Sequence, residues 1–472
     1  MVKFGTGGWR AEIARDFTEE NIRLVAQGLA QYAIREGKTD KPIVVGRDRR
    51  FLSDKAALWI SETLAANGLK VLYIARSAPT PLVMHTVLKQ ELHFGVEVTA
   101  SHNPSEYNGI KVIVDEGRDA PLEVTDELEK IIATCTPKTM SFRAAKDEGL
   151  IEEFVNPFNN FIDDILAVLD TDVIRKRGPR ILFDSMHGSS TYPLLSIFYT
   201  TRCTPDSVHG NRDTLFGGMM PAPTESTLLD LSLDVVKNGY DLGIGIDGDG
   251  DRLGIIDRDG RYISANEILV LLYYYLHEYK GWKGPVVRNL ATTHMLDRIA
   301  ADLGETCYEV PVGFKWISSK IDEVDAILGG ESSGGLTVRG HIHGKDSIYA
   351  ASLFVEMICR TGKAPGEMID ELYRKYGTFC MEECNLRYPA PARAAIDDKI
   401  MVKKLLPDFG VPVKKVNYED GCKVYFEDDS FIICRFSGTE PILRIFSEAA
   451  DSKTALGYID AFHAFLADEL AE

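Results

Sequence analysis

Short apolar runs alternate with longer amphipathic stretches along most of this chain. A short apolar run rich in β-branched residues predicts a strand, whereas apolar residues spaced three or four apart predict a helix that is buried on one face. The regular alternation of the two predicts parallel sheets covered by helices. The predicted strands are Lys41–Gly46, Val71–Ile74, Phe94–Val98, Ile181–Asp184 and Asp241–Ile246, and the clearest predicted helix is Asp54–Asn67.

Two polar stretches interrupt this rhythm. Residues 140–149 are predicted to be a domain boundary, and residues 389–393, which contain two prolines, are predicted to be a second linker. The chain has 472 residues, and a single hydrophobic core rarely grows beyond about 250–300 residues. We therefore expect three or four domains.

The overall charge limits the classes of partner. A formal net charge of -18 argues against nucleic acid, because nucleic-acid binding depends on neutralising phosphates, and it argues equally against an anionic membrane surface. An anionic small substrate stays compatible if Arg and Lys residues are concentrated in one cleft. The eight cysteines include no C-x-x-C pair, and no run of 18 apolar residues occurs. We expect a cytoplasmic protein with reduced thiols and no membrane span.

A serine follows one of the predicted strands. The segment Thr99–Pro104, here called the serine loop, comes directly after Phe94–Val98, and ligands of open α/β sheets bind at the carboxyl ends of strands. Ser101 could act as a nucleophile if its anion or its phosphate is stabilised. Lys111 could shuttle a proton or contact a phosphate. For Ser101 taken alone, an ordinary serine between a strand and a turn is the default interpretation.

Three carboxylates alternate with glycines in the acidic loop, Asp247–Arg252, directly after another predicted strand. Acids this close together repel one another unless a cation is bound, and hard oxygen ligands suit Mg²⁺ or Ca²⁺. An EF-hand is excluded because Arg252 and Arg258 stand where a glycine and a glutamate are required. Asp257–Gly260, by contrast, is predicted to be a solvated hairpin. The three candidate metal ligands are Asp247, Asp249 and Asp251.

Two further polar loops follow predicted strands. The glycine loop, Gly329–Gly335, comes after the strand-like run Asp325–Leu328 and offers one carboxylate and two hydroxyls, which suit the hydroxyls of a sugar. The arginine loop, Arg435–Pro441, is followed by Arg444 and combines hydroxyls, a glycine and arginines, which suit a phosphate. It is not a Walker loop. Taken singly, each loop could also be a plain structural turn.

Taken in order, these loops resemble the α-D-phosphohexomutase superfamily, which includes phosphoglucomutase and phosphomannomutase. The resemblance runs nearly from end to end of the chain. It includes the opening G-T-G-G-W-R at residues 5–10, the serine loop, D-G-D-G-D-R in the acidic loop, G-E-x-S-G in the glycine loop, and R-x-S-G-T-E-P in the arginine loop.

The resemblance implies an α/β fold of four domains around a central cleft. Three related α/β domains with mixed sheets would each contribute one loop, and a smaller C-terminal α+β domain would contribute the fourth. The expected domains are residues 1–143 with the serine loop, 144–256 with the acidic loop, 257–376 with the glycine loop and 377–472 with the arginine loop.

The resemblance also implies roles for individual residues. Ser101 would carry a phosphoryl group and, with the three aspartates of the acidic loop, would bind Mg²⁺. The other residues expected to take part in catalysis are Arg10, His102 and Lys111. Those expected to bind substrate are Arg252, Gly313, Lys315, Glu331, Ser333, His341 and Lys345. Those expected to bind the phosphate that does not react are Arg435, Ser437, Gly438, Thr439 and Arg444. A segment containing Asp48 and Arg50 resembles a family motif whose arginine is also expected to face the site.

Departures from the family pattern bear on the substrate. Gly335 stands where mannose-specific members often carry a histidine, Ser332 replaces the glutamate usual in glucose-type loops, and Gly7 replaces a serine usual in the opening motif. His341–Asp346 nevertheless resembles a segment of phosphoglucomutases. The resemblance therefore favours glucose phosphates, and it leaves the general acid/base open among Lys111, His341 and Lys345.

The reaction that the resemblance implies is an exchange of glucose 1-phosphate and glucose 6-phosphate. Phosphorylated Ser101 would donate to the sugar, and glucose 1,6-bisphosphate, the intermediate and activator, would reorient in the cleft, assisted by a mobile last domain. The alternatives are a phosphomannomutase, a phosphoglucosamine mutase, a metal-dependent sugar-phosphate phosphatase or a sugar-phosphate binding protein without catalysis.

Overall fold

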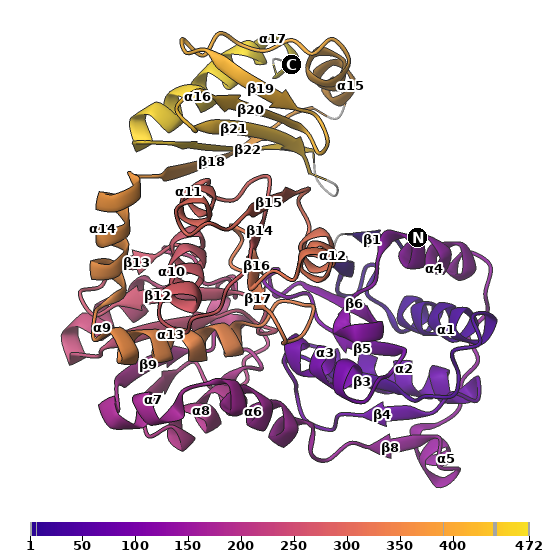
Figure 1. Ribbon diagram of the computed structural model, residues 1–472. Coiled ribbons are helices and arrows are strands. Elements are labelled where there is room, and N and C mark those ends of the chain that lie inside the picture. The colour runs from indigo at the N-terminus through magenta and orange to yellow at the C-terminus, as the bar shows by residue number, and fades with distance from the viewer. Residues whose placement is uncertain (1, 6, 390, 438–440, 471–472) are drawn as a thin grey trace. The chain divides into compact units, whose positions relative to one another are not determined.

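The computed structural model describes residues 2–5, 7–389, 391–437 and 441–470. The chain forms two compact units. The first unit comprises Met1–Ile268 with Ser333–Gly366, and the second comprises Leu269–Ser332 with Glu367–Glu472. The predicted α/β class is confirmed (Figure 1). The chain contains mixed sheets that are covered by helices and, in addition, an antiparallel C-terminal sheet.

The first sheet has the strand order β1-β2-β6-β5-β3-β4-β8, with β7 paired to β6. Its centre is parallel, because β3 pairs in parallel with β4 and β5, whereas β6 runs antiparallel between β5 and β2. The strands are β1 (Phe4–Gly5), β2 (Gly8–Glu12), β3 (Ile43–Arg47), β4 (Val71–Tyr73), β5 (Phe94–Val98), β6 (Tyr107–Val114), β7 (Arg118–Asp119) and β8 (Ile151–Glu153).

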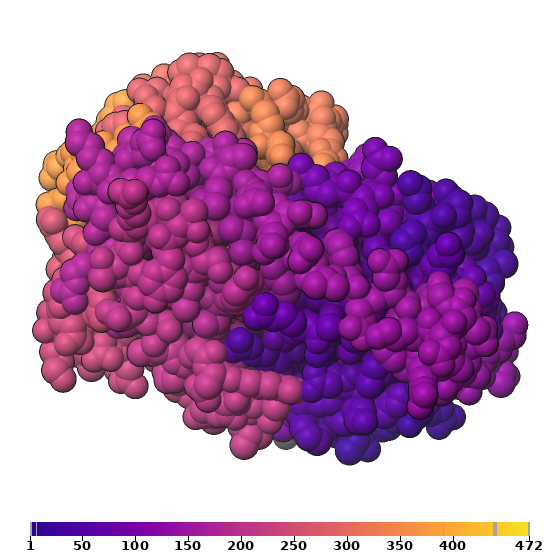
Figure 2. Space-filling view, turned by 90° about the horizontal axis from the view of Figure 1, so that it is seen from below, coloured from indigo at the N-terminus to yellow at the C-terminus, as the bar shows by residue number. Residues whose placement is uncertain are grey.

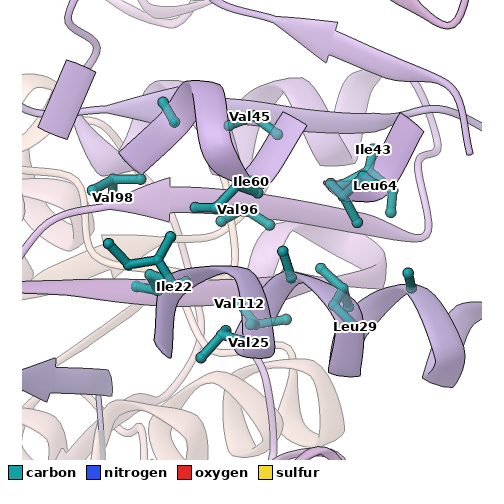
Figure 3. Close-up of a cluster of buried hydrophobic side chains, with 14 of the residues drawn as sticks. Ile22, Val25, Leu29, Ile43, Val45, Ile60, Leu64, Val96, Val98 and Val112 are labelled. Carbon is teal, nitrogen blue, oxygen red and sulfur yellow. The ribbon is translucent and has the colours of Figure 1, made fainter. Parts of the chain in front are cut away.

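Helices bury both faces of this sheet. On one face, Val45, Val96 and Val112 come from three neighbouring strands and share a cluster with Ile22 of α1 and Ile60 of α2 (Figure 3). Helix α3 packs on β3 and β5 from the other face. Strands that are covered on both sides read as continuous apolar runs, which explains the sequence pattern. The helices of this region are α1 (Glu19–Arg35), α2 (Ser53–Ala66), α3 (Thr80–Lys89), α4 (Leu122–Ile132) and α5 (Phe142–Asp147).

The second sheet also belongs to the first unit and has the order β10-β9-β11-β12-β13. Strand β11 pairs in parallel with β9 and antiparallel with β12. Figure 2 shows residues of the first two sheets, indigo to magenta, forming one continuous surface. The strands are β9 (Arg180–Asp184), β10 (Thr204–Val208), β11 (Leu242–Ile246), β12 (Leu253–Asp257) and β13 (Tyr262–Ile263), and the helices of this region are α6 (Pro157–Val168), α7 (Thr171–Arg177), α8 (Thr191–Thr200), α9 (Leu229–Asn238) and α13 (Ser347–Thr361).

The second unit contains a parallel group of strands and the C-terminal sheet. Strand β14 pairs in parallel with β15 and β16, and the C-terminal sheet is antiparallel with the order β18-β22-β21-β20-β19. The strands are β14 (Val286–Asn289), β15 (Cys307–Val310), β16 (Leu328–Gly330), β18 (Cys380–Arg387), β19 (Val413–Asn417), β20 (Cys422–Phe426), β21 (Phe431–Phe436) and β22 (Ile442–Ala449), and the helices are α11 (Met295–Asp302), α12 (Phe314–Val324), α15 (Ala392–Asp397), α16 (Ser452–Phe465) and α17 (Ala467–Leu470). Helices α10 (Ala265–Glu278) and α14 (Pro365–Tyr376) begin in the first unit and end in the second, and β17 (Leu336–Val338) belongs to the first unit.

Local sequence signals fix several helix ends. The side chains of Asp346 and Asp451 cap the first turns of α13 and α16 by accepting from backbone amides. Gly178, Gly239 and Gly362 end α7, α9 and α13 in the left-handed conformation, which costs glycine little. Acidic N-caps and glycine C-caps are typical signals of helix boundaries.

The predicted elements agree closely with these bounds. The five predicted strands and the helix Asp54–Asn67 are confirmed within two residues at each end. The strand-like run Asp325–Leu328 was placed too early, because Asp325 ends α12 in the left-handed conformation and β16 begins only at Leu328. Asp257–Gly260 forms the predicted turn, between β12 and β13. Among the described residues, no helix combines the length and the apolar character needed to span a bilayer.

Candidate active site

Ser101 lies in a buried and conformationally constrained loop between β5 and β6. Its side chain is buried, and its backbone has φ = 55°, in the left-handed region that a serine seldom adopts. The Ser101 amide donates to Thr99 Oγ1 at 2.8 Å, and Thr99 Oγ1 donates to Asp48 Oδ2 at 2.7 Å. The loop thus holds one serine in a fixed, unusual conformation, which is typical of functional sites.

Arg50 supports the serine loop from behind. Its guanidinium donates to the carbonyl oxygens of Ser101 and Asn103, each at 2.6 Å, and to those of Pro104 and Tyr107 at 2.8 and 3.1 Å. Arg50 was expected to face the site. Its guanidinium is fully buried against the serine loop and the first residue of β6, so it contacts the backbone that carries Ser101.

The acidic loop closes tightly at the carboxyl end of β11. Asp247 Oδ1 accepts from the amides of Gly250, Asp251 and Arg252 at 3.1, 2.9 and 3.0 Å. Gly250 has φ = 85°, a conformation that disfavours other residues. The carboxylates of Asp247, Asp249 and Asp251 are all buried, and their oxygens approach one another within 4.8 Å.

The serine loop and the acidic loop meet within the first unit. Ser101 Oγ donates to Asp247 Oδ2 at 3.0 Å and lies 3.4 Å from Asp251 Oδ1. The two segments are 146 residues apart in the chain, and the first two sheets bring them together. A hydroxyl beside three carboxylates can act as a phosphoryl acceptor only if cations offset the negative charge.

Two lysines supply part of that positive charge. Lys111 Nζ donates to Asp249 Oδ2 and Asp251 Oδ2, both at 2.8 Å, and Lys345 Nζ lies 3.1 Å from Asp251 Oδ2. Burial alone would lower the pKa of Lys111, but Asp249 and Asp251 raise it above its ordinary value. Burial opposes the ionisation of Asp251, yet Lys111 and Lys345 hold its pKa well below the usual range. Lys111 and Asp251 are therefore both charged.

The residues of the acidic loop fit a hard divalent cation. Burial, together with Asp249 and Asp251, raises the pKa of Asp247 well above its usual range, because three carboxylates without a cation repel one another. Asp249 Oδ2 accepts from Thr80 Oγ1 at 2.6 Å, whereas Asp249 Oδ1 is buried and has no partner among the described residues. Three carboxylates with one unused buried oxygen form a donor set that Mg²⁺ prefers.

The remaining predicted catalytic groups also lie near Ser101. His102 Nδ1 is 3.3 Å from Ser101 Oγ, and Arg10 Nη1 donates to Asn103 Oδ1 at 2.6 Å. Burial, with Arg252 and Arg10, lowers the pKa of His102, so this imidazole is neutral. Arg252 Nε is 3.9 Å from Asp251 Oδ1. The structure thus brings Arg10, His102 and Arg252 around the serine.

One supporting loop did not emerge from the sequence patterns. Residues 185–190 follow β9 and pack against the acidic loop, where Ser189 donates to the Gly248 carbonyl from both its amide and its hydroxyl, at 3.0 and 3.2 Å. Met186 and His187 both have positive φ. The signal was available, because this segment is a polar, glycine-bearing loop directly after the predicted strand Ile181–Asp184.

Replacing Gly188 with alanine is expected to displace the acidic loop. An added Cβ would lie 2.7 Å from the Gly248 carbonyl oxygen and 2.8 Å from that of Asp247, so the backbone must shift. Because small misplacements of catalytic groups are costly, we expect the turnover rate to fall by about 10²-fold and the Mg²⁺ titration to move to higher concentration. Gly457→Ala, on the open surface of α16, is the matched control. A wild-type rate and metal titration for Gly188→Ala would contradict this role.

Glu97 is a buried carboxyl for which the sequence patterns assigned no role. Its side chain is fully buried on β5 beside Lys111 of β6, and neither carboxyl oxygen has a hydrogen-bond partner among the described residues. Burial, with Asp48 and Asp249 adding to it, raises the pKa of Glu97 well above its ordinary value. Burial therefore favours the uncharged form of Glu97.

Replacing Glu97 with methionine is expected to stabilise the protein increasingly as the pH rises. Above the ordinary pKa of 4.5, folding keeps a proton on Glu97 that the unfolded chain releases, so this residue lowers stability with rising pH. Removing the buried polar group should raise the free energy of unfolding by about 1–3 kcal/mol at alkaline pH. Thermal unfolding of both proteins at pH 5 and pH 8 measures the difference. An equal difference at the two pH values would show that Glu97 does not titrate in this way.

The other predicted substrate-binding residues are divided between the two units. In the second unit, Glu331 Oε2 accepts from Asn289 Nδ2 at 3.2 Å, Gly313 precedes α12 with φ = 129°, and Lys315 lies over the Trp316 ring. In the first unit, His341 Nε2 is 2.6 Å from Asp346 Oδ2 and the pair packs near the start of α13. Ser333 and Lys345 also belong to the first unit.

Two arginines lie at directly opposed positions on the strands that flank the arginine loop. Arg435 of β21 pairs with Arg444 of β22, so both side chains lie on the same face of the sheet. Like charges in that position destabilise a sheet, and an anion between them would remove the repulsion. Asp420 Oδ1 accepts from Arg435 Nη2 at 3.0 Å, and the Ser437 amide donates to Ile442. Gly438 and Thr439 lie outside the described residues.

The sequence is similar to known proteins along most of its length. The sequence matches three domains described as "Phosphoglucomutase/phosphomannomutase, alpha/beta/alpha" domains I, II and III, over residues 1–138, 159–260 and 264–376. It is 29% identical over 461 residues to a phosphoglucomutase/phosphomannomutase of Thermococcus kodakarensis, covering 97% of this chain and 96% of that protein.

Two further proteins are similar to this chain over nearly its whole length, one in sequence and one in structure. A probable phosphoglucosamine mutase of Pyrococcus horikoshii is 30% identical over 460 residues, covering 96% of this chain and 95% of that protein. The crystal structure of a candidate phosphomannomutase from Thermus thermophilus superimposes with a TM-score of 0.84 at 26% identity and covers 99% of both chains.

Proposed function

This chain belongs to the phosphoglucomutase/phosphomannomutase family of phosphohexomutases, which are intramolecular phosphotransferases, and we propose that it interconverts glucose 1-phosphate and glucose 6-phosphate. The observation that carries this proposal is the buried contact of 3.0 Å between Ser101 Oγ and Asp247 Oδ2. In that contact the hydroxyl of Ser101, whose backbone lies in the left-handed region, is beside three carboxylates that could hold a cation.

Ser101 is the residue that we propose to carry the phosphoryl group. When the phosphoserine reacts, its Oγ–P bond breaks as the sugar hydroxyl forms a new O–P bond, and a base takes the hydroxyl proton. Phosphoryl transfer depends mainly on positioning and on neutralising charge. Arg10 and Arg252 are suited to that neutralisation, and His102 is a neutral hydrogen-bonding group beside Ser101.

The base belongs, in this proposal, to a set of three residues in the first unit. Lys111 and Lys345 both contact carboxylates of the acidic loop, and Lys111 donates to two of them, so these ammonium groups suit charge neutralisation and phosphate binding. His341 is paired with Asp346, an arrangement that orients an imidazole for proton transfer. We therefore place His341 first among the three.

Mg²⁺ would be held by Asp247, Asp249 and Asp251, with the phosphoserine at residue 101 as a further ligand. When bound, the cation would offset the charge of the transferring phosphoryl group. Thr80 and Lys111 orient the Asp249 carboxylate, and the backbone amides of the acidic loop orient Asp247. Magnesium dependence is general in this family.

Several polar residues, each considered within its own unit, have proposed roles in binding the substrate. Glu331 and Ser333 would bind sugar hydroxyls, and Gly313 and Lys315 would contact the substrate from the segment before α12. The opposed arginines Arg435 and Arg444 would bind the phosphate that does not react, together with Ser437, Gly438 and Thr439. A second phosphate site is needed because the proposed intermediate and activator, glucose 1,6-bisphosphate, carries two phosphates.

The substrate is tested by comparing rates. We propose glucose because His341–Asp346 resembles the corresponding phosphoglucomutase segment, although the similar proteins include a phosphoglucosamine mutase and a phosphomannomutase. Initial rates with the 1-phosphates of glucose, mannose, glucosamine and ribose, each with its bisphosphate activator, should show the highest kcat/KM for glucose 1-phosphate. A higher value for the mannose or glucosamine phosphate would reassign the substrate within the family.

The phosphatase alternative finds no support among the similar proteins. A phosphatase would release inorganic phosphate at the rate at which it consumes the sugar phosphate. We expect release at a small fraction of the mutase rate, measured in the same reaction mixture.

A further inference from the structure

Four arginines of the first unit lie close to the carboxyl ends of β3 and β4. Arg47 ends β3, Arg49 follows it, and Arg76 follows β4. Arg212 comes from the loop after β10 and donates through Nε and Nη2 to the carbonyl oxygens of Arg49 and Arg50, at 3.1 and 3.3 Å. The four residues Arg47, Arg49, Arg76 and Arg212 are here called the arginine patch. Ligands of open α/β sheets bind at this end of the strands.

The arginine patch contains one carboxylate for its four guanidinium groups. Asp54 accepts from Arg47 Nε at 2.6 Å and from Arg212 Nη1 at 2.7 Å. No other acidic side chain pairs with any of the four arginines in the part of the chain that the structure describes. The whole protein has a formal net charge of -18. A positive patch that is left uncompensated on so acidic a chain attracts small anions.

Two of the four arginines are occupied by contacts within the protein. Arg47 is buried, and its guanidinium donates to two carbonyl oxygens of the segment after β4, at 3.0 and 2.8 Å. Arg212 uses all three of its nitrogens on Asp54 and on the backbone after β3. These contacts join β3 to β4 and to the loop after β10, so Arg47 and Arg212 have a structural role.

Arg49 keeps one edge of its guanidinium unused. Its Nη1 donates to the Gly210 carbonyl at 2.8 Å and lies 3.5 Å from Thr191 Oγ1, whereas its Nε and Nη2 have no hydrogen-bond partner among the described residues. The side chain is half-buried, and burial, with the positive charges of Arg212 and Arg76, lowers the pKa of Arg49. No carboxylate offsets these effects, so an anion at the unused edge would relieve the repulsion.

Arg76 is exposed and lies over two aromatic rings. Its guanidinium is 4.4 Å from the centre of the Tyr192 ring and 5.4 Å from that of the Phe158 ring, and the two rings pack edge to face. The rings belong to α8 and α6, which pack on each other (Figure 1). The guanidinium makes no hydrogen bond or ion pair with the described residues. Stacking thus orients a planar cation whose edges are available to an anion.

The start of α8 brings the two available guanidinium groups near each other. Thr191 and Tyr192 are the first two residues of this helix, and the first contacts Arg49 while the second contacts Arg76. The N-cap residue, Ser190, makes no side-chain hydrogen bond to the first turn. The free amides at the start of a helix favour negative charge. Two arginine edges and a helix start therefore lie together on the surface of the first unit.

We propose that the arginine patch binds a small molecule that carries a diphosphate group, with Arg49 and Arg76 each binding one phosphoryl group. A guanidinium edge forms two parallel hydrogen bonds with one phosphoryl group. Two phosphoryl groups carry about -3 to -4 charges, and the four arginines exceed Asp54 by three charges. The ligand is free pyrophosphate or the diphosphate of a nucleotide, which present the same group.

This site is separate from the proposed active site. None of the four arginines makes a hydrogen bond or an ion pair with the serine loop or the acidic loop in the described structure. Binding of a diphosphate to the patch therefore does not depend on whether Ser101 carries phosphate.

Calorimetric titration of the full-length protein with inorganic pyrophosphate, in the absence of Mg²⁺, tests the proposal. Arg76→Gln removes one charge and one guanidinium edge, and folding should lose little because the guanidinium makes no hydrogen bond. We expect the Kd of one pyrophosphate site to rise about 10- to 100-fold, since hydrogen bonds between charged groups are the strong ones. The mutase rate without pyrophosphate should stay at the wild-type value.

Arg143→Gln is the matched control, because the Arg143 side chain on α5 is 94% exposed and lies outside the arginine patch. This variant should titrate like the wild type. A wild-type titration for folded Arg76→Gln as well would overturn the proposal.

Chemical modification locates the site without any substitution. Phenylglyoxal reacts with accessible guanidinium groups, and mass mapping of peptides identifies the arginines that have reacted. In the wild-type protein, pyrophosphate should protect Arg49 and Arg76 and should leave Arg143 reactive. Protection confined to Arg435 and Arg444 would assign the bound pyrophosphate to the arginine loop and would refute a site at the patch.

Three ligands distinguish the group that the patch recognises. Inorganic phosphate can occupy only one guanidinium edge, so its Kd should be at least about 10-fold higher than that of pyrophosphate. Equal Kd values for these two ions would contradict the assignment of a diphosphate. ADP that binds at least as tightly as pyrophosphate would identify a nucleotide as the ligand, and weaker binding of ADP would identify the free ion.

Discussion

Replacing Ser101 with alanine should abolish both turnover and labelling of the protein by ³²P-glucose 1,6-bisphosphate. The hydroxyl is the only group of the serine loop that donates to the acidic loop, at 3.0 Å from Asp247 Oδ2, so no described neighbour in that loop can replace it. Removal of a covalent nucleophile should lower the mutase rate by at least about 10³-fold. The measurement is the initial rate together with the stoichiometry of bound label.

Ser105→Ala is the matched control for this experiment. Ser105 follows the serine loop and makes no hydrogen bond with the described acidic loop, so the variant should keep both label and rate. Intact mass spectrometry should find one added phosphate on the wild type and on Ser105→Ala, and none on Ser101→Ala. A near-normal mutase rate for Ser101→Ala would refute the assignment of the phosphoryl carrier.

Replacing Asp249 with alanine should remove activity and its dependence on Mg²⁺ together. Asp249 offers one oxygen to Thr80 and Lys111, and its other oxygen is buried without a partner among the described residues, so the variant loses the oxygen best placed for a cation. A bound cation contributes several kcal/mol to stabilising charge in the transition state, which corresponds to a fall of about 10³-fold in rate. Titration of the rate with Mg²⁺ gives both effects.

Asp259→Ala controls for the loss of a carboxylate from an Asp-Gly turn. Asp259 lies in the exposed turn between β12 and β13, where it accepts from the Arg261 amide, and its removal should leave the Mg²⁺ titration unchanged. If Asp249→Ala kept a wild-type titration, the acidic loop would not be the metal site. Lys111 would then have to be explained as a purely structural partner of two aspartates.

The effects predicted for Ser101→Ala and Asp249→Ala both depend on the balance between negative and positive charges around Ser101. Asp247, Asp249 and Asp251 face the ammonium groups of Lys111 and Lys345, and the guanidinium groups of Arg10 and Arg252 lie close to the same carboxylates. Binding of a doubly charged cation would therefore leave this group of side chains with an excess of positive charge, and a phosphoserine of about -1.5 to -2 charges would offset most of that excess. The contacts therefore suit a site in which the phosphate and the cation bind together.

Local sequence determined the elements of this protein and the chemistry of its loops. Apolar runs such as Phe94–Val98 predicted strands, because a strand buried on both faces needs apolar residues at nearly every position. The resemblance in motif order then assigned the serine and acidic loops to one family. The run Asp325–Leu328 shows the limit of this reasoning, because the length of a strand depends on where the preceding helix ends.

Only the tertiary structure decided which distant groups meet. Ser101 and Asp247 are 146 residues apart, and Arg49 and Gly210 are 161 residues apart, so no local pattern could pair them. Sequence patterns likewise could not show that Arg50 lies behind the serine loop, that Gly188 supports the acidic loop or that Glu97 is buried with no hydrogen-bond partner among the described residues. These facts depend on how sheets pack against one another, and packing is set by the shape and burial of whole layers. A residue's local neighbours fix its conformation, whereas its environment is fixed by chain segments that the local sequence does not contain.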